Sequence, residues 1–295
     1  MNPSHHFGGD WTEDKLFRLK KYLSAYMTIF TSNIGASKLH TIYVDAFAGT
    51  GYRSVTKAQS NAAKLPFLDD EEAISFQKGS AYIALELEPS FDEYLFIEQS
   101  PEYSQELEVL RTKFPEKARN VSIVQQDANI FLQTWCRQKN WRFNRAVMFL
   151  DPYGMQVEWE TIKVIAKTRA IDLWILFPLG VAVNRLLTKN CPPPGAWSER
   201  LTRFFGTEDW KDAFYQECQQ IDLFGGEAGL VKEANFDSIG RYFIERLKTI
   251  FEGVAENPLP LRNTKNIPIF LLCFAASNPK GAKTAVKIAQ HILGK

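Results

Sequence analysis

The sequence predicts an α/β protein whose core is a doubly wound, mainly parallel sheet. Between residues 41 and 177, short β-branched and aromatic runs alternate with longer amphipathic stretches. Such alternation indicates repeated β-α-β units, in which helices connect parallel strands. Acidic residues follow four successive strands of this series, at the edge where open parallel sheets bind ligands. A chain of 295 residues with 45% apolar content can bury one large core, so 1–295 is interpreted as a single domain.

The chain begins with a helix and continues into the alternating series. Residues 11–33 carry apolar side chains at helical spacing, and Thr12 is a candidate N-cap. A strand at 41–45 and a glycine turn follow, whereas 52–78 is polar and irregular and is interpreted as a loop insertion. The next predicted elements, in chain order, are helix 79–87, strand 94–97, helix 101–114, strand 121–125, a helix ending near Lys139, strand 146–150, helix 158–167 and strand 171–177.

The last third of the chain departs from this alternation. Residues 180–250 are rich in aromatic side chains and in helical spacing, with breaks at 191–195 and 224–226. This pattern predicts an α-helical insertion with an aromatic core, packed beside the sheet. A strand at 267–274 and a closing helix that ends at Leu293 are expected to complete the sheet.

The glycine turn after the first strand is the most informative segment for function. The strand ends in Asp45 and continues through Phe47 to the turn that contains Gly49 and Gly51. A dinucleotide fingerprint would have a third glycine where Ser54 stands, and it presents amides to a pyrophosphate. A carboxylate at this place would repel phosphate and favour a ligand with an ammonium group. S-adenosylmethionine is such a ligand, so it is predicted to be bound by Asp45, Phe47, Gly49 and Gly51.

Three further positions extend this predicted cofactor site. Glu98 follows the second strand and is expected to accept the ribose hydroxyls, whereas Asp127 after the third strand is expected to accept the adenine amino group. Ala128 leaves room beside the ring. The alternative is that such acids are helix N-caps, which suits Asp127 and is open for Asp45, but does not suit Glu98, because Glu is a weak cap. Glu98 lies 47 residues past Gly51, more than the roughly 20 of a compact unit, so the insertion must leave from the glycine turn.

The turn after the fourth strand predicts the site of chemistry. A planar amine attacks a sulfonium methyl only when acceptors draw its lone pair out of conjugation. The Asp151 side chain and the Pro152 carbonyl are the expected acceptors, Tyr153 is expected to stack on the ring, and Gly154 lines the substrate side. An ordinary Asp-Pro turn is the structural alternative.

A second candidate substrate contact lies just beyond the fifth strand. Asn184 and Arg185 are placed on the same edge of the sheet. Arg185 could bind a phosphate or acidic group of the substrate, and a structural salt bridge is an equally open interpretation.

Composition excludes several classes of protein. No apolar run reaches membrane-spanning length and the N-terminus lacks a signal-peptide pattern, so a cytoplasmic protein with no membrane association is expected. The four cysteines and four histidines show no ligand spacing, which argues against a metal site. The net charge of +1 does not indicate nucleic-acid binding by itself, although no acidic residue occurs from Asn257 onward.

The chain as a whole resembles the three-Cys-motif partner protein family. The matching segments are Trp11-Thr12, Lys15-Leu16, 44–51, 96–98, 127–129, 149–156, 171–180, Asn184-Arg185 and 277–279. The resemblance implies a Rossmann-like class I methyltransferase fold and an association with a three-cysteine, radical-type partner protein. The Asp-Pro-Tyr-Gly turn is also similar to the Asp-Pro-Phe-Gly turn of tRNA guanine-N2 dimethyltransferases, which points to an exocyclic base amine.

The sequence therefore favours an S-adenosylmethionine-dependent methyltransferase that acts on an amine of a nucleobase or nucleic acid, such as RNA. The alternative is a methyltransferase-like scaffold that binds its radical-type partner and transfers no methyl group. The intact strand-end acids count against the scaffold, because a scaffold has no use for them. Ser54 and Asp45 disfavour an NAD-dependent oxidoreductase.

Overall fold

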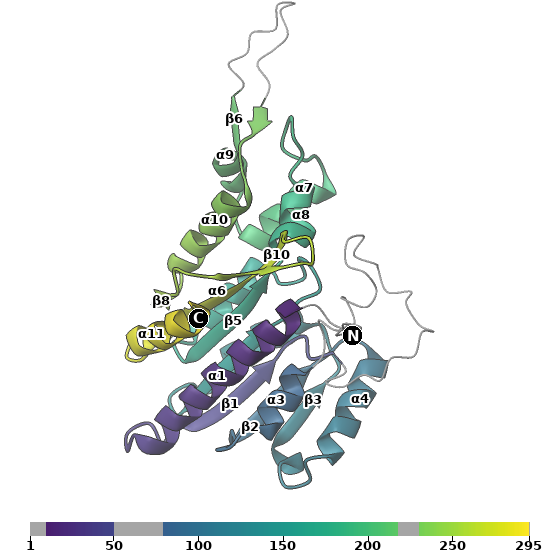
Figure 1. Cartoon of the computed structure of the whole chain (residues 1–295). Helices are drawn as coiled ribbons and strands as arrows, with labels where there is room; N and C mark the ends of the chain where they lie inside the picture. Colours follow the sequence, from purple (N-terminus) through teal and green to yellow (C-terminus); the bar gives the residue numbers. More distant parts are fainter. Residues whose placement is uncertain (1–9, 50–78, 218–229, 295) are drawn as a thin grey trace, which may run out of the picture.

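The computed structural model describes residues 10–49, 79–217 and 230–294, and its centre is one mixed sheet (Figure 1). Gly51, the predicted 52–78 insertion and the glycines near 225 lie outside these residues. The strand order in the sheet is β3-β2-β1-β4-β5-β10-β8, with β9 paired to the outer part of β10. The strands are β1 His40–Asp45, β2 Glu93–Ile97, β3 Val121–Val124, β4 Asn144–Leu150, β5 Ile171–Phe177, β8 Gly253–Val254, β9 Leu259–Arg262 and β10 Pro268–Ala276.

Five neighbouring strands of the sheet run parallel, in the order β3, β2, β1, β4 and β5. This arrangement confirms the predicted doubly wound, mainly parallel sheet. β1 lies between β2 and β4, and Asp45 is in register with Phe96 on one side and Phe149 on the other. Only β10 among the neighbours of β5 is antiparallel to it. β2 and β3 lie on one side of β1 in the sheet, whereas the chain crosses to the other side to form β4 and β5. The carboxyl ends of β1 and β4 therefore form the switch point at which open α/β sheets bind ligands.

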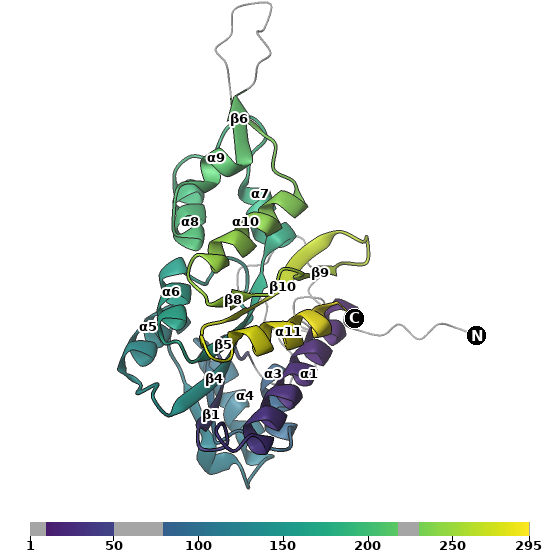
Figure 2. The ribbon, with the colours of Figure 1, turned by 90° about the vertical axis from the view of Figure 1, so that its left-hand side faces the viewer.

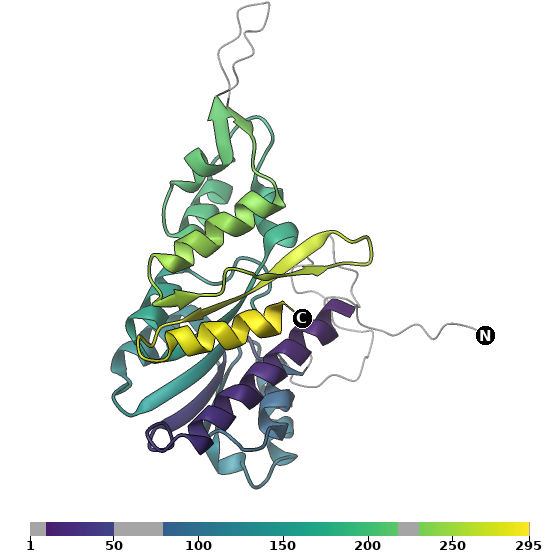
Figure 3. The ribbon, with the colours of Figure 1, turned by 60° about the vertical axis from the view of Figure 1, so that its left-hand side comes forward.

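Helices cover both faces of the sheet (Figures 1 and 3). Successive strand residues point to opposite faces: Tyr43 packs under one layer of helices, whereas Ile42 and Val44 pack under the other. The first layer contains α1 (Asp10–Ser32), α3 (Ser80–Glu86), α4 (Pro101–Thr112) and α11 (Ala282–Leu293). The second contains α5 (Ala128–Gln138), α6 (Trp159–Lys167), α8 (Ala196–Phe205) and α10 (Phe236–Lys248).

The N-terminal helix α1 lies across the first face, next to α3 and α11 (Figures 2 and 3). Its stripe from Leu19 to Met27 is buried, as helical spacing predicted. The prediction of Thr12 as N-cap was wrong, because the helix already includes Asp10 and Thr12 is buried inside its first turns.

The region predicted as a helical insertion contains helices and one small sheet. The π-helical turn η2 (Leu179–Val183), α7 (Asn184–Leu186), α8, α9 (Trp210–Phe214) and α10 follow β5. Phe177 of β5 stacks on Phe243 of α10 at 4.2 Å between ring centroids, so the aromatic residues do form a core against the sheet. The antiparallel pair β6 (Tyr215–Glu217) and β7 (Leu230–Lys232) was not predicted, and it projects from the top of the molecule in Figure 1.

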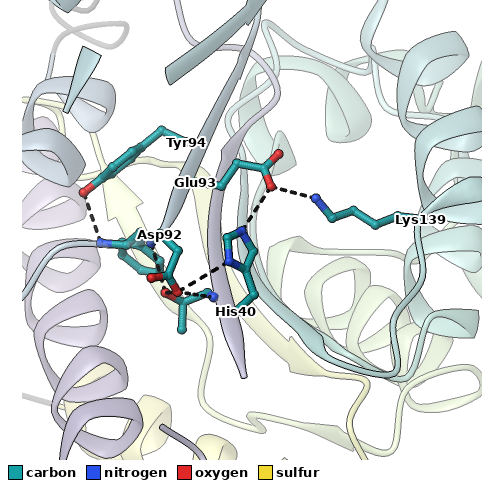
Figure 4. A network of polar contacts seen from close by, with 7 residues as sticks. His40, Asp92, Glu93, Tyr94 and Lys139 are labelled. Carbon is teal, nitrogen blue, oxygen red and sulfur yellow. Dashed lines mark hydrogen bonds and ion pairs between the residues drawn. The ribbon is translucent and has the colours of Figure 1, made fainter. Parts of the chain in front are cut away.

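A polar network ties the amino ends of β1 and β2, at the edge opposite the predicted site (Figure 4). Asp92 Oδ2 accepts hydrogen bonds from the amide and the hydroxyl of Thr41 at 2.7 and 2.8 Å. Glu93 pairs with Lys139 at 2.7 Å and with His40 at 3.4 Å. Thr41 is buried, whereas His40, Asp92, Glu93 and Lys139 are half-buried or exposed, and together they join β1, β2 and the end of α5. The short helix η1 (Ala118–Asn120) leads into β3.

Candidate active site at the carboxyl edge of the sheet

The structure brings the carboxylates of Asp45 and Asp151 to neighbouring strand ends. Asp45 is the last residue of β1, and Asp151 directly follows β4. Asp45 is in register with Phe149, two residues before Asp151, and the two carboxylates interact electrostatically. Both acids are at least nine-tenths buried, so their charges are only weakly screened by solvent.

Asp45 is fully buried and is only partly compensated by hydrogen bonds. The Ser80 hydroxyl and the Phe47 amide donate to its carboxylate, and the Tyr43 hydroxyl lies 3.4 Å from Oδ2. Burial raises the pKa of Asp45 to about 7, and the Asp151 charge adds to the rise, while Ser80, Phe47 and Lys15 oppose it. Its Oδ1 has no hydrogen-bond partner among the described residues. Such a buried acceptor is costly unless a ligand satisfies it.

Glu98 fixes the glycine turn after β1. Its Oε2 accepts the Gly49 amide at 2.9 Å, and its Oε1 accepts the Ser100 amide at 2.8 Å. Gly49 has φ +58°, a left-handed conformation that suits glycine. Burial raises the pKa of Glu98, and these backbone amides oppose that rise. Each carboxylate oxygen keeps a second lone pair for another donor.

Asp127 caps α5, as the structural alternative held. Its Oδ1 accepts the Ile130 amide at 3.0 Å. The next residue but one, Asn129, was not among the predicted site residues, yet it joins α5 to the turn after β4. Asn129 donates to the Gln156 carbonyl and accepts from the Glu158 amide, both at 2.9 Å.

The turn after β4 is braced from within. The Tyr153 amide donates to Gln156 Oε1 at 2.7 Å, and the Gln156 carbonyl is held by Asn129. Gly154 has φ +80°, and a Cβ there would meet nothing within 4 Å, so its backbone conformation and not crowding calls for glycine. Pro152 is buried and Tyr153 is half-buried. The predicted catalytic turn is thus one rigid unit together with the start of α5.

A buried lysine from α1 completes this edge of the site. Lys15 Nζ lies 2.6 Å from Asp151 Oδ2, and Lys15 is fully buried. Burial raises the pKa of Asp151, whereas the Lys15 ammonium lowers it. The other oxygen, Asp151 Oδ1, has no hydrogen-bond partner among the residues that the structure describes. The sequence analysis did not predict Lys15 as a site residue. Its position four residues before Leu19 places it on the apolar face of the helix, and this spacing indicates that Lys15 is buried.

Asn184 and Arg185 occupy different environments. Asn184 Oδ1 accepts from Lys232 Nζ at 2.8 Å, and its carbonyl accepts from the same ammonium at 3.1 Å, so Asn184 anchors β7. Arg185 is exposed beyond the end of β5. Substrate binding by either residue stays a prediction, as do the cofactor contacts of Phe47, Gly49, Asp127 and Ala128.

Comparisons with known proteins address the fold. No family model and no curated protein matches this chain. A solved structure of a DUF519 family protein from Legionella pneumophila is 16% identical and covers 98% of this chain and 92% of its own, with a TM-score of 0.51. The magnesium protoporphyrin IX methyltransferase from Synechocystis with bound SAH is 11% identical, with coverages of 87% and 84% and a TM-score of 0.35. A putative methyltransferase from Escherichia coli is 14% identical, with coverages of 72% and 86% and a TM-score of 0.29.

The chain has the Rossmann-like, doubly wound and mainly parallel α/β fold that the sequence predicted. The similarity to the Legionella protein, with a TM-score above 0.5, spans nearly the whole chain. The sheet itself is mainly parallel, and β10, which lies between β5 and β8, is antiparallel to both. Identities this low carry the fold and no activity. Membership of the three-Cys-motif partner family stays a prediction from the sequence motifs. Within the described ranges, no helix combines the length and the apolar character needed to cross a membrane.

Proposed function

We propose that this chain is an S-adenosylmethionine-dependent methyltransferase. The observation that carries the proposal is the buried pair Asp45 and Asp151 at the switch point of the sheet, each with one oxygen that lacks a partner among the described residues. Two buried carboxylates against the one ammonium of Lys15 favour a cationic ligand with N–H donors. An adenosylated methionine supplies both an ammonium group and a positive sulfonium.

The cofactor would lie along the carboxyl ends of β1, β2 and β3. In this arrangement Asp45 faces the ammonium, and Phe47 and Gly49 contact the methionine part; a contact from Gly51 is also proposed. Glu98 would use the lone pairs that its backbone contacts leave free to accept the ribose hydroxyls. Asp127 and Ala128 flank the adenine.

The transfer step would take place at the turn after β4. The bound cofactor would supply an electrophilic methyl group, with the electron pair of the carbon–sulfur bond going to sulfur, and the acceptor nitrogen would lose a proton to solvent. Asp151 Oδ1 and the Pro152 carbonyl accept the N–H groups of the amine, and Tyr153 stacks on the ring. The bracing of this turn by Gln156 would keep these acceptors in position.

An exocyclic amine of a nucleobase or nucleic acid, such as RNA, is the acceptor class that we propose. The Asp-Pro-Tyr-Gly turn supports it, as does the charge of the segment after Asn257, which contains bases and no acids. Arg262 and Lys265 of that segment flank the tip of the β9–β10 hairpin. The antiparallel register places this tip beyond the carboxyl end of β5. A cytoplasmic location is part of this proposal.

Isothermal titration with S-adenosylmethionine and with its demethylated product tests the cofactor claim. Binding is expected in the wild type, Asp45→Ala should weaken it, and Asp151→Asn should retain it while abolishing transfer. The absence of binding in the wild type would refute the proposal. Incubation with methyl-labelled cofactor and separate pools of tRNA, rRNA, DNA, protein and small metabolites would identify the acceptor. Labelling of no pool, together with co-purification of a three-cysteine radical-type protein, would favour the scaffold alternative.

A further inference from the structure

The buried Lys15 is the one fully buried lysine in the described chain, and it comes from an element far from the turn it contacts. Lys15 belongs to α1, whereas its partner Asp151 follows β4, 136 residues later. Lysine is rarely buried, because removing an ammonium group from water is costly. The N–O distance of 2.6 Å is that of a strong charge-assisted hydrogen bond.

We infer that Lys15 is a positioning residue of the transfer site, which holds Asp151 by Oδ2 as an ionised carboxylate and leaves Oδ1 to accept an N–H of the acceptor amine. This inference rests on the proposed function. The asymmetry of the Asp151 carboxylate supports it, since one oxygen is bound at 2.6 Å and the other has no partner within the described ranges. An acceptor held by one oxygen can present its other lone pairs in a fixed direction.

The helix that carries Lys15 is itself fixed on the sheet. The Arg18 guanidinium donates to the Ile292 carbonyl of α11, and to Asp14 at 2.9 Å. One turn further on, the Tyr22 hydroxyl donates to Asp172 of β5 at 2.7 Å. These contacts set the position of α1 along the sheet, so Lys15 reaches Asp151 from a rigid support.

The charges around Asp151 explain why a lysine is needed there. Asp45 and Tyr43 face it from β1, and Lys15 faces it from α1. Burial favours protonation of Asp151, and a protonated Asp151 would be a weaker acceptor. The Lys15 ammonium also lowers the pKa of Asp45, so one cation acts on both acids of the site. The Phe149 ring lies 5.8 Å from Nζ.

A purely structural ion pair is the rival explanation, and a matched control separates the two. Lys117 is also buried, and its ammonium donates to the carbonyls of Leu85 and Leu87 at 2.6 and 3.0 Å. It precedes β3 and therefore lies toward the amino edge of the sheet, away from Asp151. Lys15→Met and Lys117→Met each remove one buried ammonium, but only the first removes it from the site.

We expect Lys15→Met to lose about 100-fold in kcat and to lose less in its affinity for S-adenosylmethionine. The acidic limb of its kcat–pH profile should move to higher pH, because Asp151 takes up a proton more easily without Lys15. Lys15→Arg, which keeps the charge, should restore part of kcat and the position of the limb. Lys117→Met should change neither. Should Lys15→Met not fold, Lys15→Gln carries the same expectation.

A second readout does not depend on activity. The ¹³C signal of the Asp151 carboxyl group, assigned by its loss in Asp151→Asn, is titrated in the wild type and in Lys15→Met without cofactor. A higher pKa in the variant supports the inference, and an unchanged pKa overturns it. An unchanged kcat–pH limb in an active Lys15→Met protein would also overturn it. Failure of the wild type to bind the cofactor or transfer a methyl group would instead refute the proposed function.

Discussion

Replacing Asp45 by asparagine should stabilise the protein at alkaline pH. The pKa of this buried carboxyl rises from its ordinary 3.8 to about 7 in the folded protein, mainly because burial disfavours the charge. The folded state therefore binds more protons than the unfolded state between these values, so stability falls as the pH rises through this window. At about 1.4 kcal/mol per pKa unit, the ionised Asp45 costs about 4 kcal/mol above pH 8.

The Asp45→Asn substitution would remove that charge at nearly the same volume. Asparagine puts an NH₂ donor where Oδ1 now lies without a partner among the described residues, and an unsatisfied buried donor is costly, so part of the gain is lost. We expect Asp45→Asn to be more stable than the wild type by about 2 kcal/mol at pH 8 and to differ by less than about 1 kcal/mol at pH 5.

Urea unfolding followed by circular dichroism at pH 5 and pH 8, without cofactor, measures both differences. Asp172, whose pKa burial raises to about 6, is present in both proteins and so cancels in the comparison. Asp212→Asn at an exposed position of α9 serves as the control and should show no such pH dependence. A stability difference between Asp45→Asn and the wild type that is the same at both pH values would refute this reasoning.

Three further substitutions test other parts of the site and its support. Glu98→Gln should weaken cofactor binding about tenfold, measured by titration calorimetry, because its NH₂ group only donates and would face either the Gly49 or the Ser100 amide, which is itself a donor; unchanged affinity would argue against a role for Glu98. Gly180→Ala should lower the free energy of unfolding by about 3 kcal/mol in urea, since its Cβ would collide with the Pro268 carbonyl oxygen of β10; a neutral effect would mean that η2 can shift. Asn129→Ala should reduce kcat more than cofactor affinity, because it releases the Gln156 carbonyl behind the catalytic turn; equal losses in both would place Asn129 in the cofactor site.

The central elements were predictable because their sequence signals are local. The run 171–177 was predicted with the bounds that β5 has, and all seven of its residues are buried. Such a run, apolar except for Asp172, is typical of a strand covered on both faces. The short strands β6, β7, β8 and β9 were missed, since two to four residues carry no measurable alternation. They depend on pairing with distant partners, which a single sequence does not reveal.

The candidate site was predictable in its positions but not in its contacts. Strand-end acids in a parallel sheet must share one edge, so the neighbourhood of Asp45 and Asp151 followed from the topology alone. The partners of these acids did not follow, because Lys15 approaches from a helix that precedes the whole sheet in sequence. The backbone contacts of Glu98 were equally hidden, since an amide donor has no sequence signature.

The charge balance of this site connects its burial with its proposed ligand. When both Asp45 and Asp151 are ionised, two negative charges face the single positive charge of Lys15, so one negative charge is left in a region of low dielectric. A protein without a ligand for that charge would gain stability by replacing Asp45, and the raised pKa of Asp45 measures this cost. S-adenosylmethionine carries an ammonium, a sulfonium and a carboxylate, and so a net charge of +1. The cofactor would therefore neutralise the excess charge, and because the product has lost the sulfonium charge, the same site would hold it less tightly after transfer.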